Sequence, residues 1–168
     1  LGDVYKRQIL IILIIAFVGV NAMSKNNKTC LFSAISGTIT LNGKPVANAR
    51  IKRASDERID ESKTDENGHF SMPSVFANPI FIFISRFIPG QFVSTQKLYI
   101  YVDGMEHMLL EGIKRREAEF TESRGKPWVI TCELSDDPIR FRIDGNAFAS
   151  RCKWDSEHDK KMKILPPS

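Results

Sequence analysis

The sequence predicts an all-β protein folded as an antiparallel β-sandwich of about seven strands. Asx-Gly pairs at residues 42–43 and 103–104 stand between segments in which apolar and polar residues alternate. Such a pair is the strongest short signal for a hairpin, because both central residues of a type I′ turn need a positive φ angle. The sequence offers no convincing amphipathic helix, and several short strands separated by turn signals favour a sandwich or barrel.

The first 22 residues are expected to lie outside this domain. Residues 1–8 resemble a translated sequencing adapter and are set aside. Residues 9–20 form an apolar run shorter than the roughly 20 residues of a membrane-spanning helix. Val20-Asn21-Ala22 fits a small-x-small cleavage site, so residues 9–22 are predicted to be a signal helix cleaved near Ala22. The alternative is an uncleaved anchor or a buried core helix; export would make the protein periplasmic or secreted.

The charge balance argues against a nucleic-acid partner. Without residues 1–22 the chain has 22 basic and 19 acidic residues, a net charge of +3, and the two signs are interspersed. The densest basic cluster is Lys114-Arg115-Arg116, which has glutamates on both sides and is interpreted as a solvated strand end. A nucleic-acid-binding domain would instead concentrate its basic residues in a patch or stripe.

Three cysteines remain, and an oxidising compartment favours their pairing. The sequence allows three single bridges, of which we favour Cys132–Cys152, because it would staple a C-terminal segment that contributes little to the core. Closing such a loop stabilises a fold by about 3 kcal/mol in the chain-entropy model. Cys30 would then stay free. No cysteine pair has zinc-finger spacing and no histidine lies near to complete a site, so neither a metal nor a cofactor is predicted.

The sandwich itself is assigned to residues 30–154, between a flexible segment at 23–29 and a disordered tail at 155–168. Within it, Ile51 and Arg53 fall on one face of a strand, and Ile59 is the only inward candidate of a charged strand. Met108, Leu110 and Ile113 are expected to point inward from a later strand. The predicted strands cover residues 30–41, 49–53, 55–62, 69–73, 91–102, 106–113, 128–134 and 139–142.

Residues 75–89 do not fit this pattern, because they are too apolar for a loop and too short to span a bilayer. One interpretation is a short element that caps the open end of the sandwich. The other is an exposed apolar patch that meets a partner protein or a membrane surface. The aromatic residues that would form this patch are Phe76, Phe81, Phe83 and Phe87.

Residues 36–49 read SGTITLNGKPVANA, and residues 64–70 read TDENGHF. A G-x-P-hydrophobic-x-x-A stretch followed by T-D-x-x-G-x-F resembles the carboxypeptidase-regulatory-like domain, a transthyretin-like or immunoglobulin-like β-sandwich. The resemblance covers about residues 31–75. The remainder is similar to an uncharacterised family of small exported bacterial proteins built on that domain. The resemblance implies a fold and no known activity.

The residues that carry this resemblance all have structural explanations. A proline presets φ after a turn, an aspartate accepts bonds from backbone N–H groups ahead of it, and a glycine adopts a φ angle that other residues avoid. Asp65, Glu66 and Asn67 also offer oxygens to a calcium ion, but the further ligands of an EF-type loop are absent. The motif residues are Gly43, Pro45, Thr64, Asp65, Gly68 and Phe70.

No catalytic constellation is apparent in the sequence. The histidines at 69, 107 and 158 are isolated, and no serine has the small neighbours of a nucleophile elbow. We therefore expect a non-catalytic binding or structural module of the periplasm or cell envelope. A carbohydrate-binding sandwich is the first alternative, and it would need Tyr99, Tyr101 and Trp128 exposed on one face. The second is an envelope immunity or accessory protein for a secreted toxin.

Overall fold

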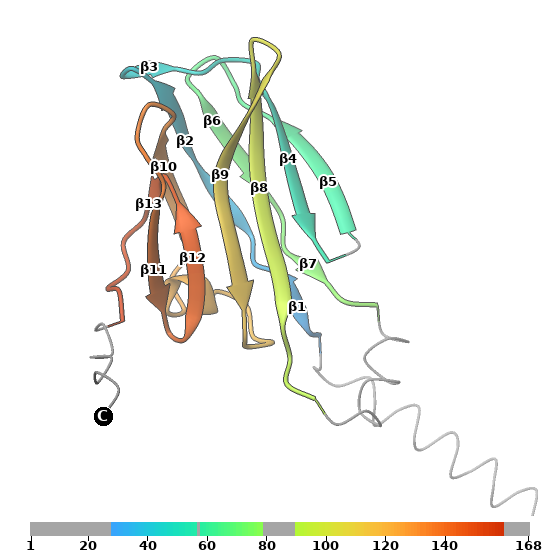
Figure 1. The fold of residues 1–168 in the computed structure, drawn as a ribbon. Helices are drawn as coiled ribbons and strands as arrows, with labels where there is room; N and C mark the ends of the chain where they lie inside the picture. Colours follow the sequence, from blue (N-terminus) through green and yellow to red (C-terminus); the bar gives the residue numbers. More distant parts are fainter. Residues whose placement is uncertain (1–27, 57, 79–89, 160–168) are drawn as a thin grey trace, which may run out of the picture.

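The computed structural model describes residues 28–56, 58–78 and 90–159 (Figure 1). The predicted signal helix and the residues Phe81, Phe83 and Phe87 lie outside these ranges. Among the described residues, no helix is long and apolar enough to cross a membrane. The elements in chain order are β1 (Cys30–Phe32), β2 (Ile35–Leu41), β3 (Lys44–Pro45), β4 (Arg50–Ser55), β5 (Arg58–Lys63), β6 (His69–Met72), β7 (Val75–Phe76), β8 (Ser94–Val102), β9 (Met105–Lys114), the 3₁₀ helix η1 (Thr121–Ser123), β10 (Trp128–Glu133), β11 (Ile139–Ile143), β12 (Asn146–Ser150) and β13 (Cys152–Lys153).

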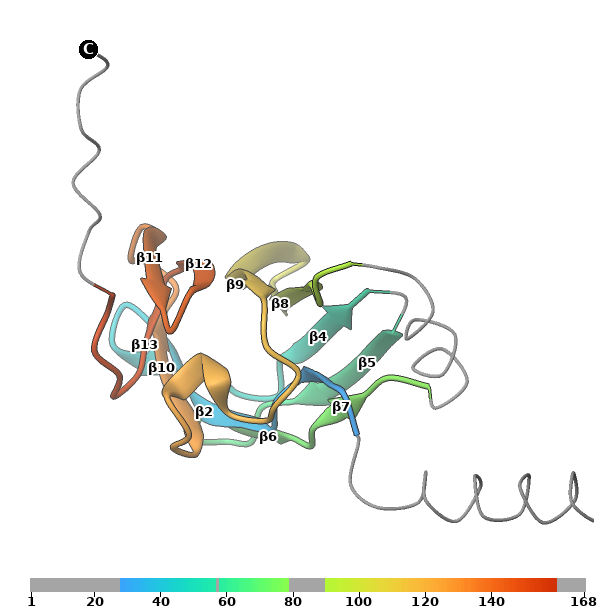
Figure 2. The same ribbon diagram turned by 90° about the horizontal axis from the view of Figure 1, so that it is seen from below.

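The strands form two main layers that face each other (Figures 1 and 2). One layer is a six-stranded antiparallel sheet in the order β11-β12-β9-β8-β4-β5. The other contains β13, β10, β2, β3 and β6, and β1 pairs with β7 at the lower end. The fold is therefore all-β with mainly antiparallel sheets, as the sequence predicted. The described residues form thirteen strands where about seven were expected, partly because five of them are only two to four residues long.

One strand pair departs from the antiparallel expectation. β2 and β10 run parallel, with Ile35 opposite Trp128 at one end and Thr40 opposite Glu133 at the other. Gly37 makes this close approach possible, because a Cβ atom there would lie 2.1 Å from the carbonyl oxygen of Ile130. The glycine of the S-G-T motif therefore has a packing role in the centre of the sheet.

Three tight hairpin turns have a positive φ angle at both central residues: 42–43, 103–104 and 144–145. The first two were predicted from their Asx-Gly pairs. The third is the Asp-Gly pair that joins β11 to β12, where only a single strand at residues 139–142 was predicted. All three turns follow the same rule, because type I′ geometry suits the right-handed twist of the flanking strands.

Glu133 fastens the first of these hairpins to the end of β10. Its carboxylate accepts hydrogen bonds from the backbone N–H groups of Asn42 (2.8 Å) and Gly43 (3.0 Å) and from the Thr40 hydroxyl (2.8 Å). The backbone N–H and the hydroxyl of Ser135 also donate to it. The bonds from Ser135, followed by the one from Gly43, hold the pKa of Glu133 far below its usual range.

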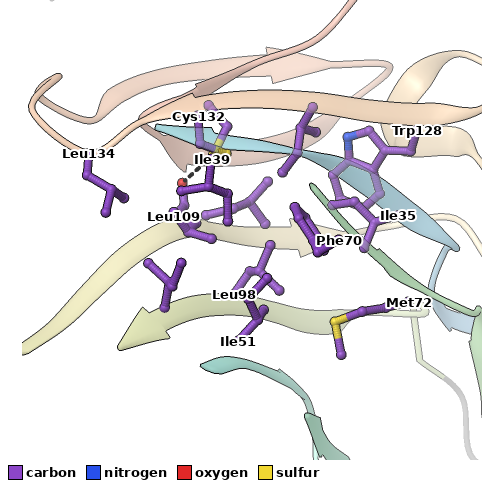
Figure 3. Packing of buried hydrophobic residues seen from close by; sticks show 14 of the residues in the cluster. Ile35, Ile39, Ile51, Phe70, Met72, Leu98, Leu109, Trp128, Cys132 and Leu134 are labelled. Carbon is purple, nitrogen blue, oxygen red and sulfur yellow. Dashed lines mark hydrogen bonds between the residues drawn. A yellow bond between two sulfur atoms is a disulfide. The ribbon is translucent and has the colours of Figure 1, made fainter. Parts of the chain in front are cut away.

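The hydrophobic core lies between the two layers. Figure 3 shows Ile39, Phe70 and Trp128 on one side meeting Leu98 and Leu109 on the other, and all five are at most 5% exposed. Burying a large apolar side chain of this kind contributes roughly 1.5–3 kcal/mol. The shared core is what holds the two sheets together.

The register of β4 and β5 reverses one expectation about the core. Ile59 is 62% exposed, whereas Asp60 turns inward, because its strand pairs Asp60 directly with Arg53. The Arg53 guanidinium is buried and donates two hydrogen bonds to Asp60, at 2.9 and 2.5 Å. It also lies 5.0 Å from the centre of the Phe32 ring, a cation–π contact. A buried charge therefore dictates which side of this strand faces inward.

Strand β9 corrects three more expectations. A bulge in the β8–β9 pairing places Leu109 inside the core and Met108 outside. Beyond it, Leu110 and Lys114 point inward, so Ile113 faces outward. Lys114, expected at a solvated strand end, is completely buried.

The predicted disulfide Cys132–Cys152 is present, and its two residues stand directly opposite each other in β10 and β13. Residues 154–159, here called the C-terminal arm, continue from β13 along the open side of the sandwich. The Trp154 ring packs edge-on against Trp128, and the backbone N–H of Asp159 donates to the carbonyl of Arg142 in β11. Residues 155–159 were assigned to a disordered tail from the sequence, but these contacts place them against the sheet.

We predict that replacing Cys132 and Cys152 with serine lowers the free energy of unfolding by about 3 kcal/mol, because a loop of 20 residues is no longer closed in the unfolded chain. Urea unfolding of both proteins under oxidising conditions measures this difference. Adding a reductant should destabilise the wild type and leave the variant unchanged. Equal sensitivity of the two proteins to reductant would contradict the assignment.

We predict that Glu133→Gln weakens the dependence of stability on acid pH. The unfolded chain protonates this carboxylate near its usual pKa of about 4.3, whereas the folded chain keeps it ionised to lower pH. The stabilisation is therefore complete above about pH 5 and is lost as the pH falls toward the depressed value. Unfolding curves of the wild type and Glu133→Gln between about pH 6 and pH 2 test this prediction. An equal fall of the free energy of unfolding with pH in both proteins would refute it.

Candidate binding surface

The most reactive-looking group of side chains lies inside the protein. The sealed cluster, as we call it, consists of Cys30, Ser33, Gln96, Lys114 and Glu122, all of them 0% exposed. These residues come from β1, the β1–β2 connection, β8, β9 and η1. It occupies the lower end of the space between the sheets, where the inward residues of β8 and β9 are polar.

Lys114 and Glu122 form the centre of the sealed cluster. The Lys114 ammonium lies 2.7 Å from the Glu122 carboxylate and donates to the Ala118 carbonyl (2.8 Å) and the Thr121 hydroxyl (2.9 Å). Glu122 in turn accepts bonds from the Ser33 hydroxyl and the Gln96 amide, each at 2.7 Å. Partners of this kind are what a buried ion pair needs, because desolvation otherwise outweighs its attraction.

Left-handed backbone conformations bring Glu122 into this position. Phe120 and Arg124, on either side of η1, have φ angles of 59° and 53°. The backbone N–H of Phe120 donates to the Ser33 hydroxyl at 2.7 Å, which fixes the loop to the start of β2. Glu122 was not among the site residues predicted from the sequence. The alternation along β9 places Lys114 inward, and a buried lysine favours a buried acidic partner. That pattern is the signal from which Glu122 could have been sought.

The chemistry of the sealed cluster is structural. Burial raises the pKa of the Cys30 thiol to about 11, and the nearby Lys114 ammonium opposes this only in part, so the thiol stays protonated at neutral pH. A protonated thiol is a poor nucleophile. Ser33 and Lys114 have no surface open to a substrate. The cluster stabilises the lower end of the sandwich.

The motif residues stand at the opposite side of the fold, around the turn between β5 and β6. Asp65 accepts hydrogen bonds from the backbone N–H groups of Asn67 and His69, both at 2.8 Å, and the bond from His69 is the main cause of its lowered pKa. The Thr64 hydroxyl accepts from the Ala49 N–H at 2.9 Å. Gly68 has a φ angle of 74°, and a Cβ there would lie 2.5 Å from the carbonyl oxygen of Ile39.

The remaining motif and patch residues can also be placed. Phe70 is buried in the core, Pro45 is exposed in β3, and Gly43 lies in the first hairpin turn. Phe76 belongs to β7 and is half-buried, with Cys30 of β1 opposite it. Across residues 28–56, 58–78 and 90–159, no three His, Cys, Asp or Glu side chains converge as metal ligands.

The outer surface of the six-stranded sheet is the exposed feature with recognition chemistry, and we call it the tyrosine face. Tyr99 and Tyr101 alternate with core residues along β8, so both rings point outward. Trp128, expected beside them, is instead 1% exposed in the opposite sheet, because it stacks on Phe32 at 5.4 Å. The other outward charged and apolar residues are Arg50, Lys52, Ala54, Ile59, Glu61, Lys63, Lys97, Glu106, Met108, Glu111, Ile113, Arg140, Arg142, Ala147 and Ala149.

Tyr101 is held firmly within this face. The Arg50 guanidinium lies 4.3 Å from the centre of its ring, and its hydroxyl donates a hydrogen bond to Glu106. The bond to Glu106 is the main cause of a raised pKa, so the phenol stays protonated. Tyr99 stands directly opposite Lys52 in β4 and Met108 in β9, and its ring has no ring-stacking or cation–π contact with any described residue.

The tyrosine face carries an excess of positive charge. It contains six basic and three acidic side chains, and every acidic one has a partner within the face. Glu111 pairs with Lys97 at 3.2 Å, Glu61 pairs with Arg50 at 3.5 Å, and Glu106 accepts from Tyr101. The basic side chains that form no ion pair with any described residue are Lys52, Lys63, Arg140 and Arg142.

Together these features define an all-β domain with two layers, a sealed polar interior and an exposed basic sheet face. Residues 35–137 match the model of a domain of unknown function, DUF6795, and the chain belongs to this family. The matched residues run from β2 to the turn after β10, so they contain four of the six strands of the tyrosine face. No curated protein matches the sequence.

We predict that Lys114→Met lowers the free energy of unfolding by roughly 3–5 kcal/mol, because Glu122 is left as an unpaired buried charge. The double variant Lys114→Met/Glu122→Leu should lose less than the sum of the two single variants. Lys97→Ala, which breaks an exposed pair on the same sheet, should cost at most about 1 kcal/mol. Urea unfolding of the wild type, the two single variants, the double variant and Lys97→Ala measures these differences. A cost for Lys114→Met no larger than that for Lys97→Ala would overturn the assignment.

Proposed function

We propose that the protein is a non-catalytic binding module of the periplasm or cell envelope, and that its ligand meets the tyrosine face. The observation that carries this proposal is the contrast between the two groups of polar residues. Apart from the Gln96 amide oxygen, the polar side chains of the sealed cluster have partners away from solvent, whereas the face exposes basic and aromatic groups without full partners. Exposed arginine, tyrosine and methionine side chains are typical of recognition surfaces.

The absence of a catalytic role is supported by the placement of the side chains that could do chemistry. Ser33, Lys114 and Glu122 lie near one another but are sealed, and the buried Cys30 thiol stays protonated. His158 lies on the C-terminal arm, where its ring stacks on Phe141 at 4.2 Å. Groups that act on a substrate must be reachable from solvent, and the sealed side chains are not.

Two observations support the finer proposals about family and compartment. The Asx-Gly turn at 42–43 and the Asp65 turn follow the pattern of the carboxypeptidase-regulatory-like domain, so we propose a distant relationship to that transthyretin-like sandwich. The disulfide Cys132–Cys152 suits an oxidising compartment, because cytosolic thiols are kept reduced. The apolar run at residues 9–20 supports export.

We predict that Tyr99→Ser/Tyr101→Ser reduces binding of the purified protein to washed cell-envelope fragments at least tenfold, because it removes the aromatic centre of the face. Val129→Ser/Thr131→Ala is the matched control, since both residues are exposed on β10 of the opposite sheet. Co-sedimentation measures binding, and thermal unfolding checks that each variant is folded. Equal losses in both variants, or none in either, would refute the tyrosine face as the ligand surface.

A further inference from the structure

We infer that the tyrosine face binds an acidic polysaccharide; this inference rests on the proposed function and names its ligand. The first argument is charge complementarity. The three carboxylates of the face are already partnered, whereas Lys52, Lys63, Arg140 and Arg142 have no ion-pair partner among the described residues. An anionic ligand can therefore pair with these groups without breaking an existing contact.

The spacing of these cations indicates an extended ligand. Arg140 and Arg142 lie on β11 at one edge of the sheet, and Lys52 lies on β4, four strands away. At about 4.8 Å per strand this separation is roughly 19 Å. A small anion could reach only one of these positions, whereas a polymer lying across the strands meets both. On β12, Ala147 lies opposite Arg142 and Ala149 lies opposite Arg140. These short side chains keep the surface low between the arginines and Lys52.

Tyr99 indicates a sugar. A pyranose ring has a face of C–H bonds that packs against an aromatic ring, and Tyr99 presents a ring with no stacking partner among the described residues. Lys52 stands directly opposite it and can pair with a carboxylate on the same or the next sugar. Tyr101 supports this arrangement from the side, where Arg50 and Glu106 hold it in place.

An acidic peptide or protein fits this face less well. An extended peptide adds to a sheet at a free edge, but β5 is rich in charged residues and the C-terminal arm donates a backbone bond to β11. A folded partner needs pockets for apolar anchor residues. Two shallow hollows of about 410 and 160 Å³ among the described residues lie elsewhere. The first is lined by residues 41, 42, 44–47 and 102 and the second by residues 136, 137, 139 and 150–153, none of which belongs to the tyrosine face.

The experiment is affinity electrophoresis of the full chain in gels that contain polygalacturonate, dextran or poly-L-glutamate. The wild type should be retarded by polygalacturonate and not by dextran, and raising the ionic strength from about 0.05 to 0.5 M should weaken binding at least tenfold. The variant Lys52→Glu/Arg140→Glu/Arg142→Glu should lose binding at least tenfold. Tyr99→Ala should lose at least about threefold, because stacking on one aromatic ring is removed.

Lys44→Glu is the matched control, because Lys44 is an exposed lysine on β3 of the opposite sheet. It should bind polygalacturonate as the wild type does, and a loss equal to that of the triple variant would show unspecific charge attraction. Retardation by poly-L-glutamate equal to that by polygalacturonate would assign the face to an acidic protein. If no polymer retards the protein, the acidic-polysaccharide ligand is wrong. The proposed function then stands only if the Tyr99→Ser/Tyr101→Ser variant still loses binding to envelope fragments.

Discussion

The buried ion pair between Lys114 and Glu122 is the constraint on which the lower half of the sandwich depends. Complete burial of a lysine at the end of β9 is costly unless an acid meets it, and the left-handed conformations on both sides of η1 place Glu122 beside Lys114. The Glu122 carboxylate accepts a hydrogen bond from Ser33, which lies between β1 and β2. The backbone carbonyl of Glu122 accepts a hydrogen bond from the Trp154 indole. One ion pair thus connects segments that are distant in sequence.

This organisation separates stability from recognition within one sheet. Successive residues of β8 and β9 alternate between the interior and the surface, so each strand serves both purposes. Gln96 and Lys114 belong to the interior network, while Tyr99 and Lys97 belong to the face. The surface residues can therefore vary chemically without disturbing the core, whereas a change at an inward position alters the support beneath the face.

Local chemistry accounts for what the sequence predicted well. Turn geometry depends on adjacent residues, so the turns at 42–43 and 103–104 could be identified from their Asx-Gly pairs, and the same rule applied to 144–145 would have identified the third. Strand orientation depends on distant partners. Ile59 faces outward because Asp60 meets Arg53, and Trp128 is buried because Phe32 and Trp154 cover it. The tyrosine face could be anticipated only in part, because its basic residues come from strands that meet only in the fold.

The C-terminal arm shows how oxidation can protect a sheet edge. The disulfide holds β13 to β10 two residues before the arm begins, and Asp159 fastens the far end by accepting backbone bonds from Asp144 and Gly145. Between these two anchors the arm passes beside β11, the strand at one edge of the six-stranded sheet. A chain with reduced cysteines lacks the first anchor, so only non-covalent contacts hold the arm beside β11. Formation of the disulfide therefore adds a covalent tie to the segment that covers this sheet edge.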